Sequence, residues 1–570
     1  MGGCMVYNDF VDYLNTLHNE SAGNAGAVAE AQRNNPYFQK VLVQRPEADF
    51  IAERVESGAP FLCVLTGYAG DGKTTILFRA LERLGMPSDR PIREDRGRFV
   101  TASGKTVSFI KDFSELPKEA RNETLREALA LLGEGISTLL VANTGPIIES
   151  FKSVFTDKED AESVILERMD ATSDYEQMVY GYPMLILNIA RIDNSDFLTK
   201  YGMKLVAEGN WSTCQACERK DLCPIYFNAA LTAQYPQAFQ FLSDFYIWEQ
   251  ELDNRATIRQ ITAHIAFALT GGLNCHDVWR RADKYWKARY LYSNLLFTGP
   301  DGRGSPTQIK GIRMLAESGL DTKNTSKDYS LFVQKDYKDL LPLELVDVAE
   351  EIDSAPQKKI PAATKQKMLK RMMLVFALNN DIKTELYRDI FATYYPEFLD
   401  YRAGRSKPSP GIKNKIFDAL QTLFTGDSNN SGTSIYVTLR RSGEQVQNVQ
   451  MLIGRMSRDD LNIISERVSC VARPDNEHYE LYLVYRAGGN TVKNRIGMPL
   501  LDYFTKISAG LIVADVDPLL SHGIESLKAE LMAACKSAGE IPNVVNILVQ
   551  KHGEWHKMEL CFEEDRISEV

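Results

Sequence analysis

One stretch, residues 60–75, constrains the fold of this chain more than any other. It contains Gly67-x-x-x-x-Gly72-Lys73-Thr74, which is the phosphate-binding loop pattern. The apolar run before the loop, residues 61–65, has the length of a buried strand, and residues 76–81 continue with helical character. A glycine-rich loop between a strand and a helix can turn successive backbone N–H groups toward an anion at the helix N-terminus. The pattern therefore predicts an α/β domain with a binding site for a nucleoside triphosphate.

The loop supplies the expected nucleotide ligands, which are Gly67, Gly70, Gly72, Lys73, Thr74 and Thr75. In this pattern the lysine reaches the β- and γ-phosphate oxygens, and the hydroxyl of the residue after it ligates Mg²⁺. We therefore expect ATP and Mg²⁺ as cofactors.

A second buried strand is predicted at residues 106–112, and it ends in an acid, Asp112. A carboxylate at this position can hold the Mg²⁺ ion together with Thr74. A hydrolysing ATPase usually has a glutamate next to this aspartate, whereas here Phe113 follows and Glu115 is the nearest acid. Nucleotide binding is thus better supported than hydrolysis. The alternative interpretation is that Asp112 caps the next turn.

Two more apolar strands are predicted, at residues 137–142 and 183–189, and the first of them ends at Asn143. Strands that alternate with helices form a parallel sheet, which binds its ligand at the carboxyl ends of the strands. Asn143 is then placed to hydrogen-bond the γ-phosphate or the attacking water. The order along the chain, with the loop strand first, then the acid strand, the Asn-tipped strand and one more strand, resembles the AAA+ subclass of P-loop ATPases.

An arginine near the start of a later helix is a candidate sensor of the γ-phosphate. Thr257 is expected to cap this helix, and Arg259 is preferred over Arg255 for the role. The alternative is a surface arginine whose guanidinium group faces solvent while its aliphatic carbons pack against the protein.

Three cysteines, Cys214, Cys217 and Cys223, follow the x2 and x5 spacing of metal ligands. Two thiolates separated by two residues can chelate one tetrahedral ion, so we predict a structural Zn²⁺. The fourth ligand would be Cys275 or the adjacent His276. An iron–sulfur cluster and unliganded cysteines are the alternatives.

The chain has 570 residues, which is too long for one ordinary core. We expect a flexible leader at 1–35, a P-loop domain with the cysteine knuckle at 36–234, a helical lid region at 235–425 and a C-terminal α+β binding or assembly domain at 433–570.

The formal net charge of -10 argues against a protein that binds nucleic acid over its whole surface. Two segments, residues 279–290 and 365–371, mix basic with aromatic or apolar residues. Such a segment can contact DNA, or it can be a solvated helix face above packed side chains. No apolar run has the length that crosses a bilayer, and the N-terminus lacks the features of a signal peptide, so we expect a cytoplasmic protein.

Several of these motifs together resemble the DptF family, the ATPase subunits of phosphorothioation-dependent DNA restriction in bacteria. The motifs are Gly67-Tyr-Ala-Gly-Asp-Gly-Lys-Thr-Thr75, Ile110-Lys-Asp-Phe-Ser-Glu115, Val141-Ala-Asn-Thr-Gly145, Cys214-x2-Cys217-x5-Cys223-Pro-Ile, Thr257-Ile-Arg-Gln and Thr270-Gly-Gly-Leu-Asn-Cys275. The resemblance covers roughly residues 40–300. It implies an AAA+-like ATPase of antiviral defence, acting on unmodified DNA with DptG- and DptH-like subunits.

Two other functions remain open. A non-motor switch would bind ATP to stabilise a homo-oligomeric scaffold that recruits a nuclease or senses a phage protein. A metabolic phosphotransferase is the third reading, and the helical lid and the cysteines disfavour it.

Overall fold

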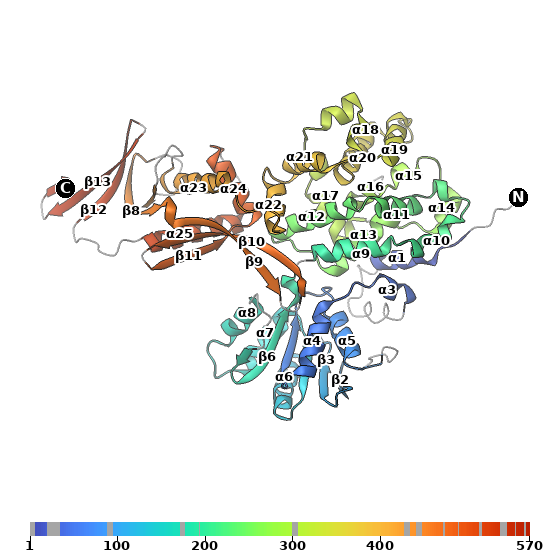
Figure 1. The fold of residues 1–570 in the computed structure, drawn as a ribbon, viewed down its shortest axis with the longest axis horizontal. Coiled ribbons are helices and arrows are strands. Elements are labelled where there is room, and N and C mark those ends of the chain that lie inside the picture. The colour runs from blue at the N-terminus through green and yellow to red at the C-terminus, as the bar shows by residue number, and fades with distance from the viewer. Residues whose placement is uncertain are drawn as a thin grey trace. The chain divides into compact units, whose positions relative to one another are not determined.

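The computed structural model describes residues 6–19, 35–87, 95–170, 177–192, 194–298, 306–426, 434–439, 447–470, 473–487, 489–511, 513, 516–535, 544–552, 554–563 and 566–569. The chain divides into two compact units (Figure 1). The first consists of Met1–Ile390 with Ser469–Asn476, and the second of Phe391–Val468 with Glu477–Val570. Each unit is described separately.

The first unit contains a six-stranded sheet with the strand order β2-β3-β4-β1-β6-β5. Its strands are β1 (Leu62–Thr66), β2 (Arg96–Val100), β3 (Thr106–Ile110), β4 (Ser137–Val141), β5 (Gln177–Val179) and β6 (Tyr182–Asn188). The four inner strands are parallel, which confirms the strands predicted from the apolar runs. The edge strands β2 and β5 are antiparallel to their neighbours and were not predicted.

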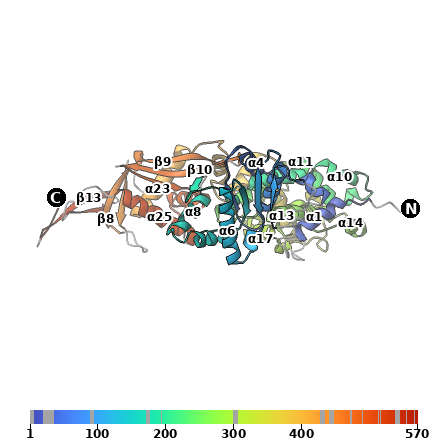
Figure 2. The ribbon, with the colours of Figure 1, turned by 90° about the horizontal axis from the view of Figure 1, so that it is seen from below.

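Helices cover both faces of this sheet, and alternate residues of β1 point to each side. Cys63 and Leu65 pack with α4 (Pro46–Ser57) and α5 (Lys73–Arg83). Leu62 and Val64 pack on the other face. That face is covered by α6 (Lys118–Gly133), α7 (Thr144–Val154) and α8 (Ala161–Asp170) (Figure 1). Figure 2 shows the same layers from below. A strand buried on both faces reads as a continuous apolar run, which is why β1 was predictable.

A helical region follows the sheet in the first unit. Its helices are α9 (Ser195–Leu205), α10 (Glu208–Gln215), α11 (Pro224–Gln234), α12 (Gln237–Glu251), α13 (Ile258–Thr270), α14 (Cys275–Arg281), α15 (Trp286–Arg289), α16 (Tyr292–Phe297), α17 (Lys310–Glu317), α18 (Tyr337–Leu340), α19 (Leu343–Ser354), α20 (Ala362–Val375) and α21 (Asn380–Ile390). The predicted cap of α13 is confirmed: Thr257 and Gln260 form a capping box.

The N-terminal helix α1 (Asp9–Asn19) corrects the expectation of a loosely attached leader. Phe10 and Leu14 are fully buried. The Asn15 side-chain amide donates to the Leu273 carbonyl oxygen at 2.9 Å, which ties α1 to the turn after α13. Residues 20–34 of the predicted leader lie outside the described residues.

Two helices, α3 (Pro36–Val41) and α4, precede β1. Extended residues separate them, and Pro46 opens the second helix. Proline has no N–H to donate within a helix, so it is well placed at a helix start.

The second unit begins earlier than the predicted position 433. It starts with α22 (Tyr395–Arg402) and α23 (Pro410–Thr425). The backbone N–H of Tyr436 donates to Gln421 Oε1 at 3.1 Å, so α23 is tied to the strands that follow it. The boundary between the two compact units, at Ile390 and Phe391, lies inside the region 235–425 that was predicted as a helical lid.

Two antiparallel sheets form the rest of the second unit, with strand orders β11-β10-β9 and β14-β13-β12-β8-β7. The strands are β7 (Ser434–Leu439), β8 (Val449–Ser457), β9 (Leu461–Cys470), β10 (Arg473–Ala487), β11 (Asn490–Arg495), β12 (Val544–Lys551), β13 (Glu554–Glu563) and β14 (Arg566–Glu569), with helices α24 (Met498–Ser508) and α25 (Pro518–Cys535). Across the described parts of both units, no helix is long and apolar enough to cross a membrane.

Candidate functional site

The loop between β1 and α5 has a backbone shape suited to an anion. Gly67, Gly70 and Gly72 have φ values of 146°, 93° and 83°. Glycine reaches this region at little cost because it has no Cβ atom. Gly72 is the N-cap of α5, so the first-turn N–H groups of that helix point out of the helix end toward the loop. This is the arrangement in which a helix N-terminus binds phosphate.

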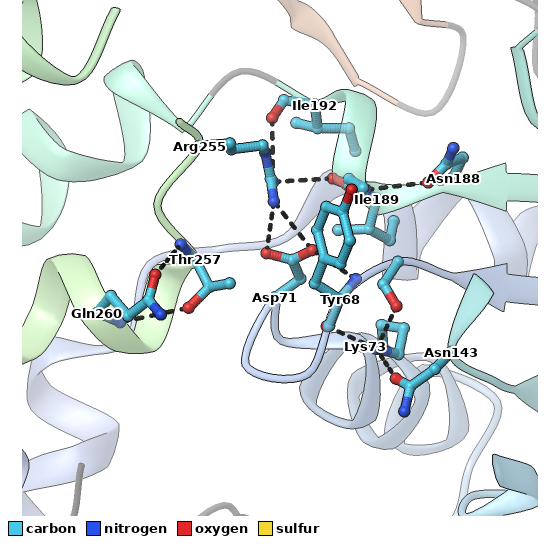
Figure 3. A network of polar contacts seen from close by, with 12 residues as sticks. Tyr68, Asp71, Lys73, Asn143, Asn188, Ile189, Ile192, Arg255, Thr257 and Gln260 are labelled. Carbon is cyan, nitrogen blue, oxygen red and sulfur yellow. Dashed lines mark hydrogen bonds and ion pairs between the residues drawn. The ribbon is translucent and has the colours of Figure 1, made fainter. Parts of the chain in front are cut away.

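Lys73 lies in the loop with its side chain turned inward. Its Nζ donates to the carbonyl oxygens of Gly67 at 3.0 Å and Tyr68 at 2.7 Å, and to Asn143 Oδ1 at 2.9 Å (Figure 3). The pKa of Lys73 is lowered to about 8, chiefly by burial; Asp71 opposes this shift, and Arg259 and Arg255 add to it. A triphosphate would bring the negative charge that stabilises the ammonium form.

The two predicted acids line the same cavity as Lys73. Asp112 lies two residues after the end of β3, and Glu115 ends the short 3-10 helix Phe113–Glu115. Both line the cavity together with Thr74. Asp112 makes no side-chain hydrogen bond that caps the 3-10 helix, so the capping interpretation has no support here.

Asn143 connects the loop to the acid strand. It follows β4, which pairs with β1 on one side and β3 on the other. Its side-chain oxygen accepts from Lys73, and its backbone N–H donates to Ser114 Oγ at 2.7 Å. Ser114 stands between the two candidate acids in the sequence and was not predicted as a site residue.

The two candidate sensor arginines have different positions. Arg255 binds the fully buried Asp71 of the loop, with Nη1 at 2.9 and 3.0 Å from the two carboxylate oxygens (Figure 3). Asp71 in turn accepts from the Tyr68 backbone N–H at 2.9 Å. Arg259 lines the cavity, and its backbone N–H donates to the Gly70 carbonyl oxygen at 3.1 Å. Of the two candidates, Arg259 lines the cavity, whereas the Arg255 side chain binds the loop.

The cavity beside the loop has a volume of ≈ 260 Å³. Its apolar wall comes from α1, α3 and α9, and none of these residues was predicted: Tyr13, Leu17, Phe38, Val41, Phe197 and Tyr201. Two cationic residues, Arg45 and Lys111, also line it and were missed. The apolar residues of α1 recur at helical spacing, which was the available signal that this helix packs inward.

The structure places the four predicted zinc ligands in one neighbourhood. Cys214 lies on α10, Cys223 precedes α11 and Cys275 begins α14. Burial raises the pKa of the Cys223 thiol to about 12, and the nearby Cys214 and Cys275 thiols raise it too. Cys217 acts in the same direction on Cys214. No group of three or more metal-ligating side chains is arranged to hold an ion among the described residues.

The two basic segments contain both buried and exposed side chains, and Arg280, Arg281, Lys284 and Lys367 are exposed. Tyr285 and Trp286 are buried, so their rings are not available to stack on bases. Lys370 and Arg371 are also buried, and they pair with Asp328 and with Asp321. These residues fit the alternative in which aromatic and basic side chains pack inside the helical region.

Comparison of the chain with protein-family models, with curated proteins and with solved structures gave no match.

Proposed function

We propose that this protein is an AAA+-like ATPase that binds Mg²⁺-ATP at the cavity beside the glycine loop. One observation carries the proposal: Lys73, Thr74, Asp112, Glu115 and Asn143 come from three separate parts of the sequence and line a single cavity. The order of the strands, with the Asn143 strand between the loop strand and the acid strand, supports the AAA+ comparison.

Each residue has a role that its chemistry suits. The glycine loop and Lys73 hold the β- and γ-phosphates, and Thr74 with Asp112 holds the magnesium ion. Asn143 and Glu115 orient the attacking water, and Arg259 contacts the γ-phosphate. Loss of the γ-phosphate then changes the contacts of α13, whose first turn carries Arg259.

The loop is hydrogen-bonded to the helical region, so a change of the bound nucleotide can move the helices. The Arg255 side chain binds Asp71 through two hydrogen bonds, and the Arg259 backbone N–H donates to the Gly70 carbonyl oxygen, so three hydrogen bonds join the loop to α13 and the residues just before it. A change at the loop would therefore move the helical region, as in other lid motions. On the resemblance to the DptF family, this movement would gate assembly of a homo-oligomer with DNA and DptG- and DptH-like subunits in a prokaryotic defence system.

A second candidate function is a switch that binds ATP tightly and hydrolyses it poorly. It is favoured by the position of Glu115, whose side chain is exposed and which stands three residues after Asp112 instead of next to it. A water held by this acid alone is less well positioned for attack.

Steady-state ATPase assays with and without duplex DNA separate the two. The motor predicts turnover that DNA stimulates and that Glu115→Gln lowers at least tenfold, whereas the exposed Glu119→Gln is neutral. Tight ATP binding with negligible turnover under both conditions would favour the switch. Phosphate transfer to a small acceptor would contradict both.

A further inference from the structure

Arg45 is a buried arginine on the wall of the nucleotide cavity, outside the glycine loop and the strands that carry the predicted site residues. It is the N-cap residue of α4, and its side chain makes no hydrogen bond that caps this helix. The side chain is only 5% exposed, and the residue lines the cavity. A buried charge is stable only where neighbouring groups compensate it. The groups around the guanidinium therefore indicate its role.

Two guanidinium nitrogens of Arg45 bond Glu47, which is fully buried. Nε donates to Oε2 at 3.4 Å and Nη2 donates to Oε1 at 3.3 Å. These distances are longer than the usual value of about 2.7–2.9 Å for a charge-assisted hydrogen bond. A guanidinium group also has more N–H donors than these two bonds use. Glu47 thus orients the plane of the guanidinium and leaves it able to bind a second anion.

The remaining nitrogen, Nη1, lies on the loop side of this pair. A Cβ atom at Gly72 would be 3.4 Å from Arg45 Nη1. Gly72 is the N-cap of α5, and the backbone N–H groups of a phosphate-binding loop cradle the α- and β-phosphates. Leu42 and Val43, which are apolar and precede Arg45 in the chain, also line the cavity. A nucleotide with its base on this apolar wall would place its α- and β-phosphates between the wall and Gly72, beside Nη1.

We infer that Arg45 binds the α- and β-phosphates of the nucleotide, and this inference rests on the proposed nucleotide site. Arginine suits the contact because it stays charged and its planar group can hold a carboxylate and a phosphate oxygen at the same time. In the proposed function Arg259 contacts the γ-phosphate instead. Arg45 should therefore strengthen the binding of ATP and of ADP equally, whereas Arg259 should favour ATP over ADP.

Calorimetric titration of Mg²⁺-ATP and Mg²⁺-ADP into the full chain tests the inference. The variant combines Arg45→Ala with Glu47→Gln, so that no buried carboxylate is left without its partner. Both affinities should fall by the same factor, on the order of tenfold. Arg259→Ala should lower the affinity for ATP and leave that for ADP nearly unchanged.

The matched control combines Arg83→Ala with Asp49→Asn. It removes an ion pair that also joins α5 to α4 but whose side chains are 61% and 43% exposed. Both affinities should be unchanged in this control. If the Arg45 double variant is unfolded by circular dichroism, Arg45→Lys takes its place. An ammonium group lacks the fork that reaches Glu47 and a phosphate together, so both affinities should still fall severalfold.

Unchanged affinities in the folded Arg45 variant would overturn the inference. A loss confined to ATP would also overturn it, because that result would place Arg45 at the γ-phosphate. Lys73→Ala separates this failure from failure of the proposed function. If Lys73→Ala binds both nucleotides as the unaltered protein does, the nucleotide site itself is wrong. If Lys73→Ala loses binding while the Arg45 variant keeps it, only the role of Arg45 is wrong.

Discussion

At the residue scale, the protonation of Lys73 makes nucleotide binding depend on pH. Burial holds its pKa at about 8 when no anion is present, and a bound triphosphate would raise that pKa. Below pH 8 the lysine is already charged. Above pH 8 binding must take up a proton, so the affinity for ATP should fall as pH rises, on the order of tenfold between pH 7.5 and 9.5.

Calorimetric titration across this range measures the effect. Lys73→Arg is the control, because a guanidinium stays charged throughout and its profile should be nearly flat. A flat profile for the unaltered protein would contradict the assignment.

The ion pair between Arg255 and Asp71 makes a prediction about stability. Asp71 is fully buried and the Arg255 side chain is 13% exposed. Arg255→Ala leaves a buried carboxylate without its partner, which should lower the free energy of unfolding by about 3 kcal/mol. Urea denaturation measures this, and adding Asp71→Asn should restore part of the loss because it removes the uncompensated charge.

The matched control for this pair is Arg96→Ala, which breaks an exposed pair with Glu127. Exposed pairs are worth less than about 1 kcal/mol. Equal losses in the two variants would show that the buried pair has no special role in holding the loop.

At the scale of elements, the loop and α13 fit together at Gly70. A Cβ atom there would lie 3.1 Å from Thr257 Oγ1 and 3.2 Å from Arg259 Cβ, and φ is 93°. Gly70→Ala should therefore separate the loop from α13 and weaken ATP binding more than tenfold. Gly135→Ala has a similar φ of 82° but open space around the added atom, so ATP binding should be unaffected in that variant. Similar affinities in both variants would refute this fit.

The strands of the first sheet differ in how well the sequence predicts them. The inner strands are buried on both faces, and their apolar runs identified them, as the glycine pattern identified the loop. The edge strand β2 alternates exposed and partly buried residues and carries little apolar signal. The apolar cavity wall was missed because α1 and α9 reach it through tertiary packing, and no local pattern reports which face of a helix meets a ligand.

At the scale of the whole molecule, the proposed nucleotide site belongs to the first unit. Its cavity lies at the carboxyl ends of the parallel strands, and Tyr13 of α1 lines it. The second unit has no assigned ligand, and an assembly role for it remains a prediction.

Calorimetric titration of Mg²⁺-ATP into the unaltered protein and into Lys73→Ala tests the central claim most directly. Lys152→Ala, at an exposed ion pair of the same unit, is the control. We predict saturable binding of one ATP per chain in the unaltered protein and the control. In Lys73→Ala we predict at least a hundredfold loss of affinity in a chain whose circular dichroism shows that it is folded. Equal ATP affinity in Lys73→Ala and the unaltered protein would contradict the claim that this loop and its lysine hold the nucleotide.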